Sequence, residues 1–169
     1  IDSLIYMDTQ SGTCPIVIER TFTAFDACGN STSCVQIITI DDTTAPEITC
    51  PADEVIEGCD ETAISGLAYS ETEVIITEVD FTSNGGIVFD SCGIDSLIYI
   101  DTQSGICPIT IERTFTAFDA CGNSTSCVQT ITIDDTTTPE ITCPADEVIE
   151  GCDETAISGL AYSEVEVII

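Results

Sequence analysis

The sequence has no lysine, histidine or tryptophan, and its only cationic side chains are Arg20 and Arg113. Thirty-one acidic residues bring the formal net charge to −29. Such a surface repels phosphate backbones and anionic lipid surfaces, so we expect no nucleic-acid partner. Without histidine, and without a glycine-rich phosphate loop, the sequence offers no constellation for nucleophilic catalysis. We therefore expect a protein that is not an enzyme.

Long apolar runs are also missing. No uninterrupted run approaches the roughly 20 residues of a membrane-spanning helix, so we expect no membrane insertion. There is no initiator methionine and no signal peptide. The chain begins inside one strand pattern and stops inside another, at residues 166–169. We therefore expect a window from a longer tandem array, for which a missing signal peptide is no argument against secretion.

The chain does contain an internal repeat. Residues 1–76 align without a gap with residues 94–169, an offset of 93. Six of the 76 pairs differ, so 70 are identical; the differences are Met7/Ile100, Thr13/Ile106, Val17/Thr110, Ile37/Thr130, Ala45/Thr138 and Thr72/Val165. A period of 93 suits one β-sandwich domain and is far too long for a solenoid turn. We expect residues 1–44 to be the C-terminal half of one repeat, 45–135 a complete repeat, and 136–169 the N-terminal part of the next.

The best-marked element of each copy is a hairpin. Residues 16–40 and their copy at 109–133 hold two alternating apolar runs around a tight polar turn, a pattern typical of a β-hairpin. Ile16, Ile18 and Phe22 share one face, which we assign to the core. Arg20 lies on the same face, as does its copy Arg113. We expect each arginine to pack its stem and form a structural ion pair with an acid near the rim.

The remaining elements are shorter. We expect strands at residues 1–7, 53–58, 73–76, 87–89 and 94–100. Thr77 as an N-cap, acids in the next turn and a terminal Asn-Gly-Gly predict one or two helical turns within 77–85. The proline-containing linkers 41–46 and 134–139 should be short and semi-rigid. Together these patterns predict an all-β fold: tandem immunoglobulin-like β-sandwich repeats with one short helix per repeat.

The number and spacing of the cysteines indicate the cellular compartment in which the protein is found. The 11 cysteines include six in each full period, and an even count indicates a disulfide framework in an oxidising compartment. Zinc is the alternative, but the CX8C and CX5C spacings and the lack of histidine disfavour it. Six cysteines allow 15 connectivities. Sandwich topology favours Cys50–Cys127 and Cys92–Cys121 at one pole and Cys59–Cys107 at the other. The alternative is local pairing, Cys121–Cys127 and Cys50–Cys59.

The same pole should gather oxygen ligands from the linker, one loop and the hairpin turn. These are Asp41, Asp42, Asp90, Asp119 and Asn123. Hard oxygen clusters suit Ca²⁺, the one cofactor that the sequence suggests, although no EF-hand pattern is present. The alternative is that the acids only solvate the surface and that the Asp and Asn side chains serve turn geometry.

Several loop residues match glycosylation patterns. Asn30 and Asn123 begin N-linked sequons, although Asn123 is also an ordinary turn residue. Ser3, Ser96, Thr43 and Thr136 each follow an aspartate and resemble the three-residue pattern of one bacterial O-glycosylation system. These matches are short.

Three segments carry a family resemblance: TAPEITCPAD at 44–53, FDSCG at 89–93, and RTFTAFDACGN at 113–123 followed by CVQTITI. They resemble hyalin-repeat (HYR-like) immunoglobulin-type domains, whose cysteine-rich bacterial versions occur in tandem arrays of secreted surface proteins and adhesins. The resemblance covers the whole chain and implies an extracellular structural or adhesive repeat without enzymatic activity. The insertion at 70–86 is longer than the simplest members carry, so the resemblance leaves the strand order there open.

Our leading expectation is a structural repeat of an extracellular bacterial filament or stalk, stiffened by disulfides and by Ca²⁺ or glycans where these are present. Its partners would be copies of itself along the fibre, because identical joints repeat one rotation into a regular helix. A fibre of many chains could instead complete the half-domain 1–44 by strand complementation from another subunit. The alternative function is an adhesive module for a glycan or protein ligand, for which few exposed aromatics besides Tyr6/Tyr99 and Tyr69/Tyr162 are available.

Overall fold

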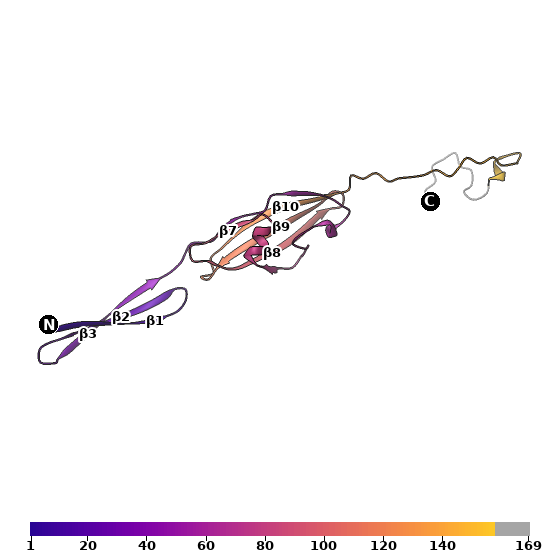
Figure 1. The fold of residues 1–169 in the computed structure, drawn as a ribbon. Helices are drawn as coiled ribbons and strands as arrows, with labels where there is room; N and C mark the ends of the chain where they lie inside the picture. The colour runs from indigo at the N-terminus through magenta and orange to yellow at the C-terminus, as the bar shows by residue number, and fades with distance from the viewer. Residues whose placement is uncertain (158–169) are drawn as a thin grey trace. The chain divides into compact units, whose positions relative to one another are not determined.

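The structure is a computed structural model that describes residues 1–157 (Figure 1). It divides into two compact units, Ile1–Thr136 and Thr137–Ile169. The first unit is mostly β, with open sheets. The described part of the second unit contains one short 3-10 helix, η2 (Glu154–Ala156), and no strand. We call residues 1–43 the first copy and residues 94–136 the second copy of the repeated sheet-forming segment, and we call positions 93 apart counterparts.

A five-stranded sheet forms the centre of residues 45–136 (Figure 1). Its order is β5 (Glu54–Glu57), β10 (Ser124–Asp134), β9 (Ile109–Asp119), β8 (Ile94–Gly105) and β6 (Val74–Ile76). Strand β5 runs parallel to β10, and all the other pairs are antiparallel. The β9–β10 hairpin confirms the hairpin prediction, because its apolar alternation fits the period of two that a half-buried strand requires.

A smaller sheet and a helix cover one face of the larger sheet. The sheet pairs β4 (Glu47–Thr49) with β7 (Ile87–Phe89), and the helix is α1 (Glu78–Ser83). The Thr77 hydroxyl accepts a hydrogen bond from the Asp80 backbone N–H at 3.1 Å, and Asp80 Oδ2 accepts one from the Thr77 backbone N–H at 3.0 Å. This capping box satisfies two backbone donors and confirms the predicted helix.

Two apolar clusters lie on β8, β9 and β10. The first contains Phe81 from α1 with Leu97, Tyr99, Phe115 and Ala117, and Ile48 of β4 and Val88 of β7 pack against it. The second contains Ile109, Ile111, Ile131 and Ile133, with Ile56 of β5 packed on it. Residues 45–93 therefore cover the sheet, and residues 94–136 provide most of the buried surface.

Arg113 forms a buried ion pair between the two clusters. Its Nε and Nη2 donate to Oδ1 and Oδ2 of Asp101, both at 2.8 Å, and the two side chains are 3% and 0% exposed. The prediction of an ion pair is confirmed, but the pair is in the core instead of near the rim. The reason is that β8 continues to Gly105, so that Asp101 lies directly opposite Arg113.

The loop before β6 closes over this pair. Arg113 donates from Nη1 to the Leu67 carbonyl at 2.9 Å and from Nη2 to the Ala68 carbonyl at 3.1 Å. The Ser70 backbone N–H donates to Asp101 Oδ2 at 3.0 Å. Buried charges are tolerated only when they are paired and hydrogen-bonded, and here every oxygen of the carboxylate is occupied.

The first copy forms a three-stranded sheet of β1 (Ser3–Ser11), β2 (Ile16–Phe25) and β3 (Ser31–Ile40). Its β2–β3 register, from Ile16↔Ile40 to Phe25↔Ser31, matches that of β9–β10. Arg20 pairs with Asp8 at the same 2.8 Å distances, but these side chains are 33% and 36% exposed. The same sequence therefore builds the same sheet and the same ion pair, here without a cover.

The two ion pairs make a matched test of burial. We expect Asp101→Ala to lower the free energy of unfolding of residues 45–136 by about 3–5 kcal/mol, because it leaves the buried Arg113 guanidinium uncompensated. Asp8→Ala should cost much less, because water solvates Arg20. Urea unfolding followed by circular dichroism measures both. Equal costs for the two variants would contradict this account of the core.

Candidate functional site: the joint between the copies

A disulfide joins the two copies. Cys14, in the turn between β1 and β2, is bonded to Cys121, in the turn between β9 and β10, with 5.2 Å between their Cα atoms. The second disulfide, Cys50–Cys127, lies within residues 45–136 and has a Cα separation of 5.7 Å. The Cys14–Cys121 bond therefore joins the part of the chain before the linker 41–46 to the part after it. This linker connects β3 to β4.

The predicted cysteine pairing is partly correct. Cys50–Cys127 is confirmed. Cys92–Cys121 is wrong because Cys121 is bonded to Cys14, and Cys59–Cys107 is wrong because both cysteines are free. The local alternatives, Cys121–Cys127 and Cys50–Cys59, are wrong for the same reasons. The prediction kept every bond inside one period, whereas the structure uses Cys14, the counterpart of Cys107, from the preceding period. The 93-residue offset is the signal that could have suggested this partner.

The β9–β10 turn is organised by Asp119. Its Oδ1 accepts from the backbone N–H groups of Cys121 and Asn123, and its Oδ2 accepts from Asn123 Nδ2, all at 2.8 Å. Burial alone would raise the pKa of the Asp119 carboxyl, but the hydrogen bonds from Asn123 and from the Cys121 backbone N–H together hold the pKa below its usual value. The carboxylate is thus committed to the turn.

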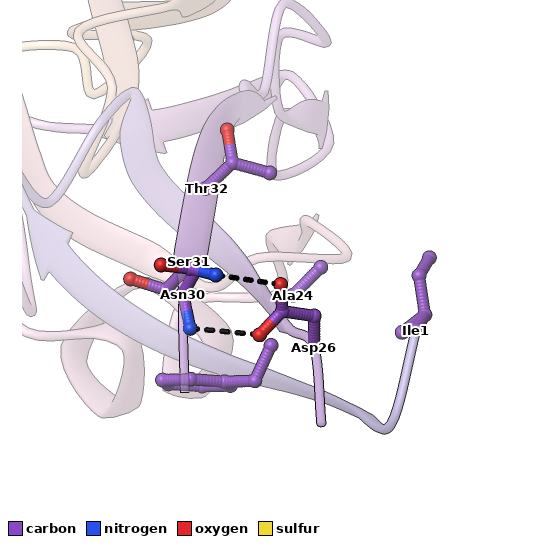
Figure 2. Close-up of a pocket in the computed structure, with 7 residues that line it drawn as sticks. Ile1, Ala24, Asp26, Asn30, Ser31 and Thr32 are labelled. Atoms are coloured by element: carbon purple, nitrogen blue, oxygen red, sulfur yellow. Dashed lines mark hydrogen bonds between the residues drawn. The ribbon is translucent and has the colours of Figure 1, made fainter. Parts of the chain in front are cut away.

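The counterpart turn in the first copy shows that this arrangement is local. Asp26 accepts from Cys28 N, Asn30 N and Asn30 Nδ2 at 2.8–2.9 Å. Figure 2 shows the hydrogen bonds from Asn30. Its pKa is also lowered, chiefly by the Asn30 side chain. A pocket lies against this turn, and Asp26 is its only ionisable side chain among the described lining residues. The hydrogen bonds that the Asp26 carboxylate accepts are therefore those of the turn itself.

Asn123 also ties the turn to the linker. Its Nδ2 donates to the backbone carbonyl of Asp42 at 3.0 Å, across 81 positions of sequence. Asp42 Oδ1 in turn accepts from the Thr44 backbone N–H at 2.9 Å, and Pro46 is buried. The joint therefore combines a disulfide, a hydrogen bond from the turn and a linker with internal order.

Asp42, Asp90 and Cys92 form a group at this joint, with their ligand atoms within 4.8 Å of one another. Asp42 Oδ2 is buried, and no donor in residues 1–157 forms a well-aligned hydrogen bond with it. The Thr44 N–H is the main cause that lowers the pKa of the Asp42 carboxyl, and the nearby Cys92 thiol adds to it. The same carboxylate raises the pKa of the Cys92 thiol.

Of the five predicted calcium ligands, Asp42 and Asp90 have ligand atoms within 4.8 Å of each other. Asn123 and Asp119 lie at the same joint, since Asn123 Nδ2 donates to the Asp42 carbonyl and the Asp42 charge acts on the Asp119 carboxyl. Asp119 and Asn123 are held in the turn, and Asp41 Oδ1 lies 3.6 Å from the Cys14 sulfur. Ca²⁺ takes six to eight oxygen ligands, and two carboxylates beside a thiol supply few of them. The free lone pairs of Asp42 Oδ2 are the feature that suits a cation, and calcium stays a prediction.

The predicted glycosylation residues are exposed with two exceptions. Ser3, Thr43, Thr136 and Asn30 are exposed, whereas Ser96 and Asn123 are half-buried. The Thr136 hydroxyl donates to Glu57 Oε2 at 2.7 Å, and the Asn123 amide is used at the joint. A sugar on Asn123 would replace one of the two Nδ2 hydrogens, so Asn123 could keep only one of its hydrogen bonds to the Asp42 carbonyl and to Asp119 Oδ2. Glycans at the other positions stay predictions.

No family model, curated protein or solved structure matches this chain in comparisons with known proteins. Across the described residues, no helix has the length and apolar character that crossing a membrane requires.

Calcium can be tested through the group at the joint. Under the calcium prediction, about 5 mM Ca²⁺ should saturate an extracellular-type site and raise the Tm of the chain relative to EDTA. Asp42→Asn should remove the increase, and Asp41→Asn should retain it because Asp41 lies against Cys14. Differential scanning calorimetry measures the shift. An unchanged Tm in the unsubstituted chain would rule out calcium here.

Proposed function

We propose that this chain is a structural repeat of an extracellular bacterial filament or stalk, built from immunoglobulin-like sandwiches of the hyalin-repeat type. The observation that carries the proposal is the Cys14–Cys121 disulfide, because it connects one copy of the repeat to the next. A binding module needs a stable domain, but it does not need each domain to be cross-linked to its neighbour. In a load-bearing or shape-maintaining array, a cross-link between neighbouring domains would stiffen each joint.

The joint restricts motion in three ways. The linker is short and contains a buried proline, Pro46, with a fixed φ. The Asn123–Asp42 hydrogen bond fixes the turn against the linker, and the Cys14–Cys121 bond closes a second covalent path beside it. Because the copies are nearly identical in sequence, every joint in an array would have the same geometry. One repeated rotation generates a regular fibre.

The chemistry of the chain fits an extracellular location. Structural disulfides persist in oxidising compartments and are rare in reducing ones. A net charge of −29 favours solubility outside the cell and disfavours unspecific association with anionic surfaces. The partners under this proposal are further copies of the repeat.

Protease access to the linker tests the joint. Asp-N protease should cut at Asp41 and Asp42 several-fold faster in a Cys14→Ser/Cys121→Ser variant, because the linker then opens without a covalent brace. The matched control, Cys28→Ser/Cys34→Ser, removes two free, exposed cysteines that lie outside the joint and should be cut at the original rate.

The filament itself is tested by electron microscopy of the native secreted protein. We expect extended fibres with a regular axial repeat that bend more sharply after treatment with a thiol reductant. Globular particles without an axial repeat, together with equal cleavage of both double variants, would overturn the proposed function.

A further inference from the structure

A small polar cavity lies at the edge of the core of residues 45–136. Its volume is about 40 Å³. Its polar lining comes from five parts of the chain: Glu54 of β5, Ser65 in the loop before β6, Asn84 at the end of α1, Arg113 of β9 and Gln129 of β10. The cavity therefore lies where the covering residues 45–93 meet the five-stranded sheet.

The Gln129 amide brings a hydrogen-bond acceptor to this cavity. Gln129 is 7% exposed, and its Nε2 donates to the Ala52 carbonyl at 2.8 Å. This bond fixes the orientation of the amide, because a flipped amide would set two acceptor oxygens against each other. Gln129 Oε1 is then the other end of the amide, and no group in residues 1–157 donates a well-aligned hydrogen bond to it.

Arg113 brings a donor to the same cavity. A guanidinium carries five N–H donors. Two of them bond to Asp101, and two bond to the Leu67 and Ala68 carbonyls. Within the described part of the chain, one N–H of Nη1 is left, although Arg113 is only 3% exposed. The two buried polar residues of the cavity therefore leave one donor and one acceptor between them.

Water is the molecule that satisfies a donor and an acceptor at once. Buried polar groups are almost always hydrogen-bonded, because an unpaired group in the core loses its bonds to solvent without gaining others. A buried water typically makes about three hydrogen bonds and needs a volume of about 10–15 Å³. The cavity exceeds this volume and has a polar lining, so it meets both requirements.

We propose that this cavity binds an ordered water molecule, which accepts a hydrogen bond from Arg113 Nη1 and donates one to Gln129 Oε1. The second water hydrogen goes to Asn84 Oδ1, because Asn84 Nδ2 already donates to the Asp80 carbonyl at 2.7 Å. The Arg113 guanidinium thereby uses all five of its donors inside the fold.

Other ligands fit the cavity less well. Pockets for organic ligands measure about 300–1,000 Å³, far above the volume found here. A metal cation would face the Arg113 guanidinium, and an anion would face the Glu54 carboxylate and the Gln129 oxygen. Arg113 also has its counter-ion already, in Asp101. Only a neutral molecule that both accepts and donates matches the two walls of the cavity.

The water would have a structural role in the repeat. Arg113 holds the Leu67 and Ala68 carbonyls against the sheet, and Gln129 holds the Ala52 carbonyl. A water between these two side chains extends the contact to the end of α1. The inference goes beyond the proposed function, because it concerns the interior of each repeat whether or not the repeats form a fibre.

The proposal is tested by NMR on the full chain with ¹³C-labelled isoleucine methyl groups. Ile131 lines the cavity, so its methyl protons should show nuclear Overhauser cross-peaks to water. A water that stays longer than the tumbling time of the chain gives cross-peaks of opposite sign in the laboratory-frame and rotating-frame spectra. Ile111 is the matched control: it is 0% exposed and belongs to the same apolar cluster, but it does not line the cavity. Its methyl protons should show no such cross-peak.

Two substitutions assign the signal to the proposed site. Gln129→Met keeps the length of the side chain but removes the acceptor, so the Ile131 cross-peak to water should be lost. Gln36→Met makes the same change at the counterpart of Gln129, which is exposed, and should leave the cross-peak unchanged. A dispersed methyl spectrum shows that each variant is folded, and the unsubstituted chain tests the proposal even where Gln129→Met does not fold.

Either of two results would overturn the inference. The first is the absence of a water cross-peak at Ile131 in the unsubstituted chain. The second is a cross-peak that persists at full intensity in folded Gln129→Met. Neither result bears on the cleavage and microscopy tests of the proposed function.

Discussion

The buried pair of Arg113 and Asp101 is the interaction on which the rest of this structure depends. A chain with two cations places one of them in the core, where it is bonded to a carboxylate and to two backbone carbonyls. Its guanidinium also lies 4.6 Å from the centre of the Tyr99 ring, and the Tyr99 hydroxyl donates to the Ala68 carbonyl. Strands β8 and β9 and the covering loop therefore meet at one charged group, and none of them can shift without leaving a buried charge unpaired.

The first copy separates what the sheet does alone from what the cover adds. Arg20 and Asp8 keep the same bidentate geometry and the same position over Tyr6 without a covering loop. The ion pair and the apolar face are therefore properties of the three strands, since cross-strand neighbours determine both. In the second copy, the covering residues exclude water from the ion pair. They also add the hydrogen bonds from Arg113 to the Leu67 and Ala68 carbonyls and from the Ser70 N–H to Asp101.

Local patterns in the sequence were sufficient to predict the hairpin, the helix and the existence of the arginine ion pair. Each depends on residues near one another along the chain or directly across a turn. The partner Asp101 was not predicted, because the strand pattern 94–100 stops one residue before it. The Cys14–Cys121 bond was not predicted either, because its two cysteines are 107 positions apart and belong to different periods. Of the proposed calcium ligands, Asp119 and Asn123 were better described by the alternative of turn geometry, which the copy at Asp26 and Asn30 supports.

The charge of the chain explains why its joint is covalent. Copies that each carry a large negative charge repel one another, and surface ion pairs cannot offset the repulsion when nearly every exposed charge has the same sign. Hydrogen bonds such as that from Asn123 to Asp42 contribute only about 1 kcal/mol each. A disulfide holds its partners regardless of ionic strength and of the charge between them. In this chain the contact between successive copies is made through such a bond, and the two arginines are used inside the copies, where charge neutralisation matters most.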